Sequence, residues 1–233
     1  MNDIVIITGG ASGLGLEIAK AFLNKGFNIV IIDRDKNKMK NIKELEKKYT
    51  DRIILQYLGD IRDEEFVKNT ISDITNKYTI AYLVNNAAVI KACHFSENTK
   101  EDLDDVLGCV IGAILMTTQA IPHMKKVNKG KILNVMSSAA LLGKPMESMY
   151  CCAKYALKGF TNSLRNELVG TNIKVIGIFP GGINTPFYDN IRSYTPKKVS
   201  DKYMNPARVA EVIVENSLKI DTLNISSIKI DRL

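Results

Sequence analysis

Tyr150 and Lys154 have the clearest chemical potential in this sequence, because they stand four residues apart with small residues between them. On a helix this spacing places both side chains on one face, one turn from each other. A free phenol has a pKa of ~10, and lowering it to ~7 requires about 4 kcal/mol of preferential stabilisation of the phenolate. A neighbouring ammonium contributes to that through charge attraction. The pair indicates a proton carrier that works near neutral pH, unless it is an ordinary surface pair on a helix.

A glycine-rich turn near the start of the chain gives this pair a context. The apolar run 4–7 is typical of a strand that is buried on both faces of a parallel sheet. The turn after it opens into an amphipathic helix, and its glycines let a ligand approach the backbone, while the helix start favours a diphosphate. The predicted dinucleotide-binding residues here are Gly9, Ser12, Gly13, Leu14 and Gly15. A turn that binds no ligand is the alternative.

The next apolar run, 29–32, ends at Asp33, 18 residues after Gly15. In a dinucleotide fold, the carboxylate that closes the second strand accepts hydrogen bonds from the adenosine ribose hydroxyls. Such a group repels a 2′-phosphate, which favours NAD over NADP. Arg34 follows directly, and its guanidinium is able to bind that phosphate or to stack on adenine, so NADP stays possible.

Strands and helices alternate along the rest of the chain. Further strands are expected at 53–58, 80–84, 131–136, 173–179 and 225–230, and helices at 35–48, 63–77, 99–126 (with a break near Pro122), 149–169 and 206–218. This alternation predicts an α/β fold: a single-domain, doubly wound parallel sheet of the Rossmann-like kind over residues 1–233, with helices on both faces. Ligands of such sheets bind beyond the carboxyl ends of the strands. Thr8, Asp33, Asp60, Asn85, Ser138 and Pro180 all fall at such ends.

The position of Tyr150 and Lys154, after the strand 131–136, indicates what chemistry they perform. A hydroxyl from Ser138, after the strand 131–136, is placed to hold a substrate oxygen beside Tyr150. The three residues together suit hydride chemistry, in which Tyr150 carries the proton and Ser138 positions a carbonyl or alcohol. Lys154 lowers the pKa of the phenol together with a cationic nicotinamide ring, and it holds a ribose of the cofactor.

The motifs, taken in order, resemble those of the short-chain dehydrogenase/reductases. They are Thr8-Gly9 with Gly13 and Gly15, then Asp60, Asn85-Asn86-Ala87, Ser138, Tyr150 with Lys154, and Pro180-Gly181 with Thr185. The resemblance covers nearly the whole chain. It implies that Asp60 and Ile61 contact adenine and that Asn86 and Ala87 support the cofactor riboses. It also implies that Pro180 and Gly181 belong to the cofactor site and that Ile183 and Thr185 hold the nicotinamide carboxamide. On this resemblance, a hydride then passes between the nicotinamide and an alcohol or carbonyl carbon.

Three positions depart from the pattern of that family. Ala88 replaces the usual glycine, which adds only a methyl group. Ser137 fits the usual interval to the tyrosine, but we prefer Ser138 because of its position after the strand. Cys109 stands where the family has an asparagine that helps to hold a water between the lysine and solvent, and a thiol is a weaker hydrogen-bonding group than an amide.

The segment 182–206 resembles the flexible lid that covers the substrate in this family. Specificity is expected from this lid and from Ala139, Ala140, Leu141, Met146 and His94. The helices at 99–126 and 149–169 are more apolar than one sheet face requires, so we expect a homodimer or homotetramer built on them.

Composition narrows the remaining classes. The chain has 233 residues, 45% of them hydrophobic, and a net charge of +7 with no basic cluster that contains stacking aromatic residues, so we expect a small-molecule substrate and no nucleic acid. The four cysteines and two histidines lack metal-ligand spacing, which predicts free thiols and no metal site. No apolar stretch looks long enough for a bilayer, so we expect no membrane partner and a cytoplasmic protein.

A second hypothesis follows from Cys109. It is a regulatory protein of the same fold that binds NAD(P) and turns it over poorly.

Overall fold

The computed structural model describes residues 2–188, 191, 203–219 and 223–232. Its strands are β1 (Asn2–Thr8), β2 (Asn28–Asp33), β3 (Ile54–Leu58), β4 (Tyr78–Asn85), β5 (Gly130–Val135), β6 (Ile173–Pro180) and β7 (Ser227–Ile230). The α-helices are α1 (Gly13–Asn24), α2 (Ile42–Lys48), α3 (Glu64–Thr75), α4 (Lys100–Val127), α5 (Ser148–Glu167) and α6 (Pro206–Leu218). Short 3₁₀ turns stand at η1 (Lys38–Asn41), η2 (Phe95–Glu97), η3 (Ser138–Ala140) and η4 (Pro186–Tyr188).

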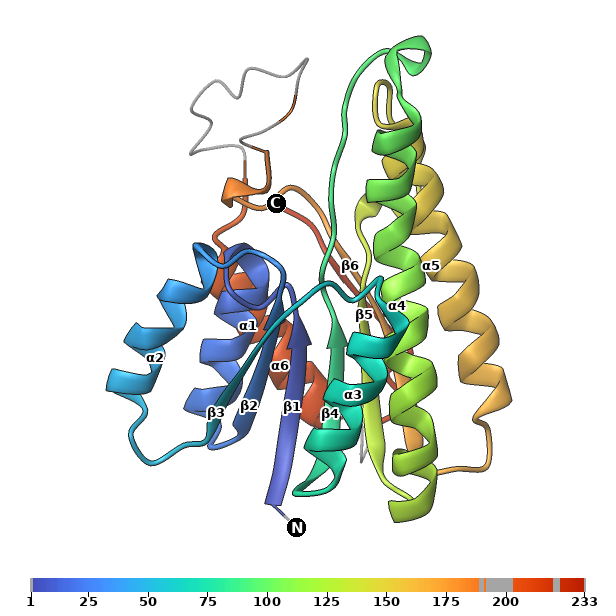
Figure 1. The fold of residues 1–233 in the computed structure, drawn as a ribbon. Helices are drawn as coiled ribbons and strands as arrows, with labels where there is room; N and C mark the ends of the chain where they lie inside the picture. Colours follow the sequence, from blue (N-terminus) through green and yellow to red (C-terminus); the bar gives the residue numbers. More distant parts are fainter. Residues whose placement is uncertain (1, 189–190, 192–202, 220–222, 233) are drawn as a thin grey trace.

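The seven strands form one parallel sheet in the order β3-β2-β1-β4-β5-β6-β7. Helices α1, α2 and α6 cover one face, and α3, α4 and α5 cover the other (Figure 1). The strand order reverses between β1 and β4, and a ligand of such a sheet binds beyond the carboxyl ends at that point. The predicted fold class is therefore confirmed.

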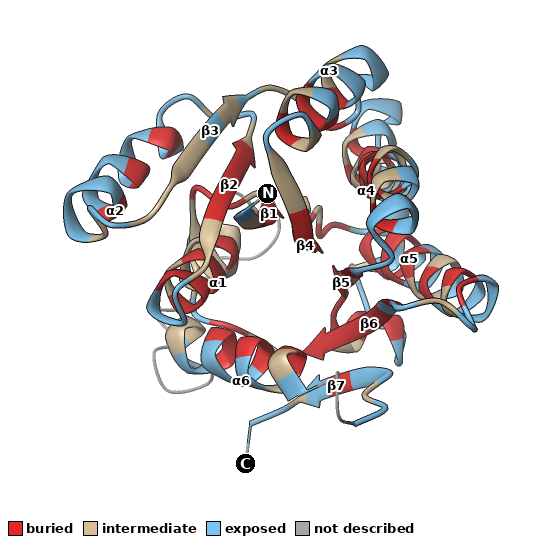
Figure 2. Cartoon of the chain, turned by 90° about the horizontal axis from the view of Figure 1, so that it is seen from below, coloured by how far each residue is buried: buried red, intermediate tan, exposed pale blue. Residues whose placement is uncertain are grey.

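Strand β1 shows why the run 4–7 is apolar without alternation. Val5 and Ile7 belong to the core under α1 and α6, whereas Ile4 and Ile6 belong to the core under α3, α4 and α5. All four side chains are fully buried, and Figure 2 shows buried residues along most of the central strands, whose first residues are less buried. Because both faces of the strand are covered, no side chain in this run reaches water, and an apolar residue is favoured at every position.

Side-chain caps set several helix starts. Asp63 accepts hydrogen bonds from the backbone N–H groups of Glu65 and Phe66, at 2.9 and 3.1 Å, which confirms the predicted N-cap of α3. Thr99 and Asp102 form a reciprocal capping box at the start of α4.

Two predicted helices differ from the observed ones. The Asp35 carboxylate accepts the N–H groups of Asn37 and Lys38, and this local turn delays the helix expected from residue 35, so that η1 precedes a shorter α2. The expected break at Pro122 is absent, because α4 continues through it to Val127. Proline removes one backbone hydrogen bond, and this one lies close to the helix end.

The predicted lid, 182–206, lies partly outside the described residues. Its two described ends are joined, since Asn184 N–H donates to the Met204 carbonyl and Met204 N–H donates to the Gly182 carbonyl, both at 2.9 Å. These bonds place both ends of the segment beside the carboxyl end of β6.

Candidate active site

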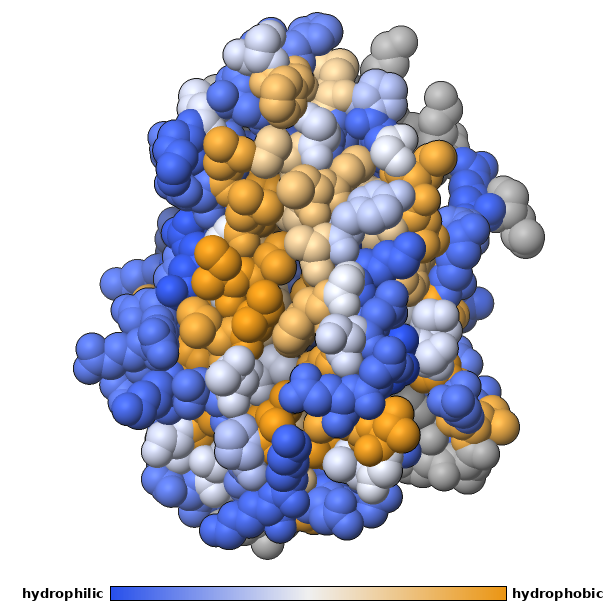
Figure 3. All heavy atoms as spheres, turned by 90° about the vertical axis from the view of Figure 1, so that its right-hand side faces the viewer, coloured by the Kyte–Doolittle hydropathy of each residue, from blue (hydrophilic) through white to orange (hydrophobic). Residues whose placement is uncertain are grey.

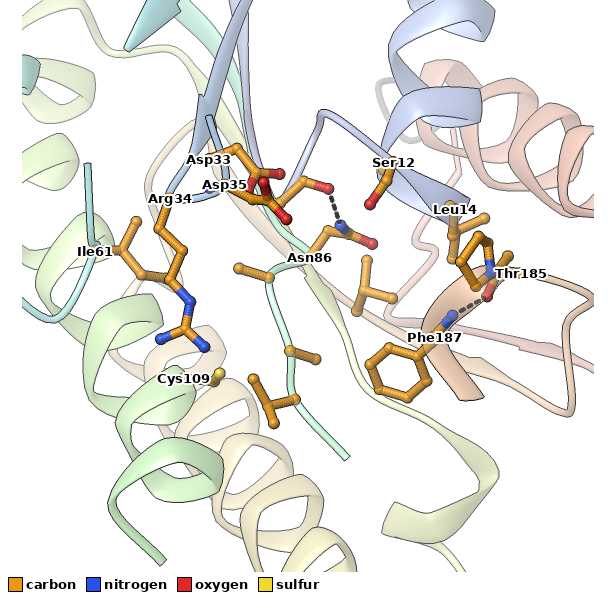
Figure 4. Close-up of a pocket in the computed structure, with 18 of the residues that line it drawn as sticks. Ser12, Leu14, Asp33, Arg34, Asp35, Ile61, Asn86, Cys109, Thr185 and Phe187 are labelled. Carbon is orange, nitrogen blue, oxygen red and sulfur yellow. Dashed lines mark hydrogen bonds between the residues drawn. The ribbon is translucent and has the colours of Figure 1, made fainter. Parts of the chain in front are cut away.

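A cavity of about 360 Å³ lies at the carboxyl ends of the strands. Nearly every residue predicted from the sequence to bind the cofactor or to act in catalysis lines it: Gly9, Ser12, Gly13, Leu14, Gly15, Asp33, Arg34, Asp60, Ile61, Asn86, Ala87, Tyr150, Lys154, Pro180, Gly181, Ile183 and Thr185. Ser138 is the exception. In Figure 4, Asp33 and Asp35 stand at one side of this cavity and Thr185 and Phe187 at the other, with Asn86 between them.

The glycine turn has no room for side chains at two of its positions. Gly9 has a φ of +62°, which L residues with a side chain rarely adopt. A Cβ at Gly15 would lie 2.2 Å from the Gly9 carbonyl oxygen, so the helix start and the turn are in direct backbone contact. This tight backbone cradle at the N-terminus of α1 fits the diphosphate of a dinucleotide.

Asn86 and Thr8 hold that turn against the end of β4. The Asn86 side-chain amide donates to the carbonyls of Thr8 and Gly9, at 3.0 and 3.1 Å. The Thr8 hydroxyl accepts the N–H groups of Asn86 and Ala87, both at 3.1 Å. The Asn86 amide is thus a positioning group for the turn as well as part of the cavity wall. Thr8 is buried, and the sequence analysis did not recognise its structural role.

Asp33 is fixed by the backbone on both sides. One carboxylate oxygen accepts the N–H of Ala11 at 3.2 Å, and the other accepts the N–H of Asp35 at 3.0 Å. An oriented, acceptor-only carboxylate at the end of β2 suits the hydroxyls of a ribose.

Ion pairs surround Asp60, at the same end of the cavity. One Asp60 oxygen accepts Nε and NH2 of Arg62 at 2.9 and 2.7 Å, and Arg34 NH1 lies 3.4 Å from that oxygen. Burial acts to raise the pKa of Asp60, but the hydrogen bonds from Arg62 outweigh it and the pKa is lowered. Arg62 and Ile61 reach this position because α4 carries glycines, Gly108 and Gly112, where it meets them.

Tyr150 lies across the cavity from Asp33, because its ring stands beside that of Phe187. Both Tyr150 and Lys154 line the cavity and are buried, at 7% and 5% exposure. Lys154 Nζ donates to the Val135 carbonyl at 3.0 Å and stands 5.5 Å from the centre of the Tyr150 ring. Helix α5 brings the two side chains together as the spacing predicts.

The pKa values of this pair follow their burial. Desolvation lowers the pKa of Lys154 from an ordinary 10.5 to about 8, and Cys109 opposes that shift. Desolvation raises the pKa of Tyr150 well above its ordinary value, with a contribution from Tyr188, whereas a hydrogen bond with the Ser137 side chain lowers it. Lys154 alone therefore does not lower the phenol pKa, and the lowering predicted from the sequence also needs the positive charge of the nicotinamide ring.

Ser137, and not Ser138, is the serine that faces Tyr150. Ser137 lines the cavity and interacts with the phenol, and its hydroxyl also accepts the N–H of Ala139 at 3.1 Å. The chain is still extended at Ser137 and turns at Ser138, which begins η3. The preference for Ser138 is corrected, because the turn starts one residue after the hydroxyl that reaches the site. The interval to Tyr150 had indicated Ser137.

Cys109 lines the cavity beside Lys154, and its thiol donates to the carbonyl of Asp105 on the same helix at 3.4 Å. Burial raises the pKa of this thiol, which keeps it protonated. Cys109, the residue that departs from the family pattern, is thus hydrogen-bonded to its own helix.

The cavity wall near Tyr150 is apolar. Ala88, Val89, Phe187 and Tyr188 line it, and the Phe187 ring lies 6.0 Å from the Tyr150 ring, centre to centre. None of the five residues from which specificity was expected, which are Ala139, Ala140, Leu141, Met146 and His94, lines the cavity as the structure describes it. Ala139 and Ala140 are fully buried in the core instead.

Comparison with known proteins agrees with this geometry. A family model described as short chain dehydrogenase matches residues 3–195. A 3-oxoacyl-[acyl-carrier-protein] reductase FabG of Thermotoga maritima is 27% identical over 224 residues, covering 91% of this chain and 89% of the relative. An uncharacterized oxidoreductase of the same organism is 34% identical over 183 residues, covering 77% of this chain and 71% of the relative.

Solved structures match the same fold. The structure titled ElxO with NADP bound has a TM-score of 0.88 and 27% identity, and covers 99% of this chain and 98% of that one. An alcohol dehydrogenase of the archaeon Thermococcus sibiricus has a TM-score of 0.87 at 18% identity, covering 99% of this chain and 96% of that one. With the glycine turn, the buried tyrosine–lysine pair and the family model in agreement, the chain belongs to the short-chain dehydrogenase family.

Proposed function

We propose that this protein is an NAD(P)-dependent oxidoreductase that transfers a hydride between nicotinamide and an alcohol or carbonyl substrate. One observation carries the proposal: a phenol and an ammonium are buried together in the same cavity that the glycine turn of β1 and α1 opens into. A regulatory protein that only binds the cofactor has no use for the buried phenol.

The residues present fit the cofactor. The backbone cradle at Gly9 and Gly15 would receive the diphosphate, and Asp33 would accept from the adenosine ribose. Lys154, which here donates to the Val135 carbonyl, would donate to the second ribose. When bound, the dinucleotide supplies the group that gives or takes a hydride and, in its oxidised form, a positive ring charge.

Tyr150 and the side chains around it carry out the proton transfer. The Tyr150 hydroxyl gives its proton to the substrate oxygen on reduction and takes it on oxidation. The Ser137 hydroxyl, already bonded to the phenol, orients that oxygen. Because Ala88, Val89 and Phe187 line this part of the cavity, we propose a neutral substrate with an apolar group next to the reacting carbon.

The experiment that tests the proposal combines turnover with binding. Fluorescence of NADH and NADPH is followed over a panel of aldehydes, ketones and 3-oxoacyl thioesters, the last because of the name of the Thermotoga reductase. Tyr150→Phe is expected to reduce turnover by about 10²- to 10⁴-fold while leaving the cofactor affinity unchanged.

A matched control is Tyr155→Phe, which removes a half-exposed hydroxyl from the same helix. Turnover that survives in Tyr150→Phe would overturn the catalytic assignment. Tight cofactor binding with no turnover on any substrate would support the regulatory alternative.

We also propose that the protein is a homodimer or homotetramer built on α4 and α5. Figure 3 shows a band of apolar side chains on the face that carries these helices, and Ile111 of α4 is 55% exposed. By length and composition alone α4 passes for a membrane-crossing helix, but its buried residues pack on the sheet and on α3 and α5. Light scattering at micromolar concentration is expected to give a dimer or tetramer, and Ile111→Glu is expected to shift it towards the monomer. A wild-type monomer would refute the interface.

A further inference from the structure

We propose that Asp105 on α4 is a specificity-determining residue that favours NAD over NADP by holding the Arg34 guanidinium away from Asp33. This inference rests on the proposed function, since it concerns the form of the cofactor. Asp33 and Arg34 are neighbours at the end of β2, where the sequence alone leaves the preference open.

The two side chains point in different directions. In Figure 4, Arg34 extends from the end of β2 towards Cys109 on α4, whereas the Asp33 carboxylate turns to the glycine turn. Arg34 NH1 lies 3.4 Å from an Asp60 oxygen and 3.8 Å from an Asp105 oxygen. The guanidinium that is able to bind a 2′-phosphate is thus engaged by carboxylates.

Asp60 alone does not account for this position. Its nearer oxygen already accepts two hydrogen bonds from the Arg62 side chain, and its other oxygen accepts the backbone N–H of Arg62 at 2.9 Å. Arg34 is the fourth and most distant donor to Asp60, at 3.4 Å. Asp105 supplies a second carboxylate on this side, 3.8 Å from the same guanidinium nitrogen, and the two weak contacts together keep Arg34 there.

The charges in this network are balanced. Arg34, Arg62 and Lys91 face three carboxylates, since Arg62 also pairs with Asp105 at 3.1 Å and Lys91 pairs with Asp102 at 3.0 Å. Lys91 is also 3.6 Å from Asp105. Removing the charge of Asp105 leaves an excess cation. Arg34 has the longest contacts and is 45% exposed, so it is the cation that is released.

A released Arg34 changes the choice between the two cofactors. NADP differs from NAD by a 2′-phosphate, which a guanidinium binds in a bidentate manner. Asp33 repels that phosphate whether Arg34 is held or released. The effect of Asp105 therefore appears in the ratio of the affinities for NADH and NADPH, and it requires Arg34.

The test is a double-mutant cycle measured by binding. Dissociation constants for NADH and NADPH are measured by the fluorescence of the reduced nicotinamide for wild type, Asp105→Asn, Arg34→Ala and the double variant. Asp105→Asn is expected to shift the ratio towards NADPH by about two- to fivefold, in the range of partly exposed ion pairs. In the Arg34→Ala background the same change is expected to shift it by less than about twofold.

Two variants of α4 serve as controls. Asp104→Asn removes an exposed charge that pairs with Lys100 and is expected to leave the ratio unchanged. Asp105→Glu keeps the charge and is expected to keep the wild-type preference. Should Asp105→Asn fail to fold by circular dichroism, Asp105→Ser provides a second neutral variant.

The inference is overturned if the neutral variants leave the ratio unchanged, or if they shift it equally with and without Arg34. Its failure is distinguishable from failure of the proposed function. Wild type that binds neither NADH nor NADPH would overturn the proposed function and this inference with it, whereas wild type that binds NADH with an unchanged ratio in Asp105→Asn overturns the inference alone.

Discussion

The two ends of the cavity use charge in opposite ways. Around Tyr150 and Lys154, the side chains are almost completely buried, and the Lys154 ammonium bonds to one backbone carbonyl. Around Asp60, the guanidinium groups of Arg34 and Arg62 are partly exposed and paired with carboxylates. Burial shifts the pKa values at the first end, whereas ion pairing sets the pKa of Asp60 at the second.

This difference indicates a division of labour. A buried group responds strongly to one added or removed charge, which suits proton transfer. A partly exposed network of balanced charges is weakly stabilising and adjustable, which suits the selection of a ligand. Substitutions at the two ends should therefore differ in the size of their effects. Substitutions in the glycine turn, which both ends share, should have the largest effect.

The largest effect is expected for Gly15→Ala. The added Cβ would lie 2.2 Å from the Gly9 carbonyl and 2.5 Å from the Asn86 amide nitrogen, so the turn must move. Such overpacking costs about 1–3 kcal/mol or more, and we expect NADH binding to be lost in a titration. Gly159→Ala is the control, because a Cβ there meets nothing within 4 Å. The control is expected to bind normally, and normal binding by Gly15→Ala would show that the cradle is not the binding site.

A smaller effect is expected for Lys154→Met, at the buried end of the cavity. It should appear in the way the unfolding free energy depends on pH. Because the folded-state pKa of Lys154 is about 8, below its ordinary 10.5, the unfolded chain binds more protons between these values. The wild-type unfolding free energy should therefore rise with pH from about 8 to 10.5, relative to that of Lys154→Met, by at most about 1.4 kcal/mol per pH unit. Chemical denaturation across this range checks the slope. Parallel curves for the two proteins would contradict the buried ammonium.

The smallest effect is expected for Arg62→Gln at the paired end. Although Arg62 bonds to both Asp60 and Asp105, its side chain is 35% exposed. We expect a loss of unfolding free energy below about 1 kcal/mol that shrinks further in high salt, because solvent screens exposed pairs. A loss of several kcal/mol that salt does not change would mean that the two ends are held in the same way.

Sequence reasoning succeeded where local chemistry decides the structure. The apolar run 4–7, the N-cap at Asp63 and the spacing of Tyr150 and Lys154 each specify their own geometry, and the structure confirms them. The cavity-lining positions also followed from the strand ends, because parallel strands bring those ends to one edge.

Sequence reasoning failed where the structure depends on a contact between distant segments, or on the exact residue at which a turn begins. Which of two adjacent serines faces Tyr150 depends on where the extended chain turns, and the turn begins at Ser138. The Phe187 ring near Tyr150 comes from a segment with no clear periodicity. The pKa of the Tyr150 phenol also depends on the burial of the site, which raises it, and that burial cannot be read from the residues next to Tyr150 in the sequence.

The central claim is that Tyr150 exchanges a proton with a substrate whose carbon exchanges a hydride with a nicotinamide held by the glycine turn. A crystal structure of the protein with NADH tests it most directly. The account predicts that the diphosphate lies on the turn of Gly9 and Gly15, that Lys154 bonds to the nicotinamide ribose, and that the Tyr150 and Ser137 hydroxyls face the reactive carbon of the ring. A complex in which the ring points away from Tyr150, or in which NADH binds elsewhere, would contradict it.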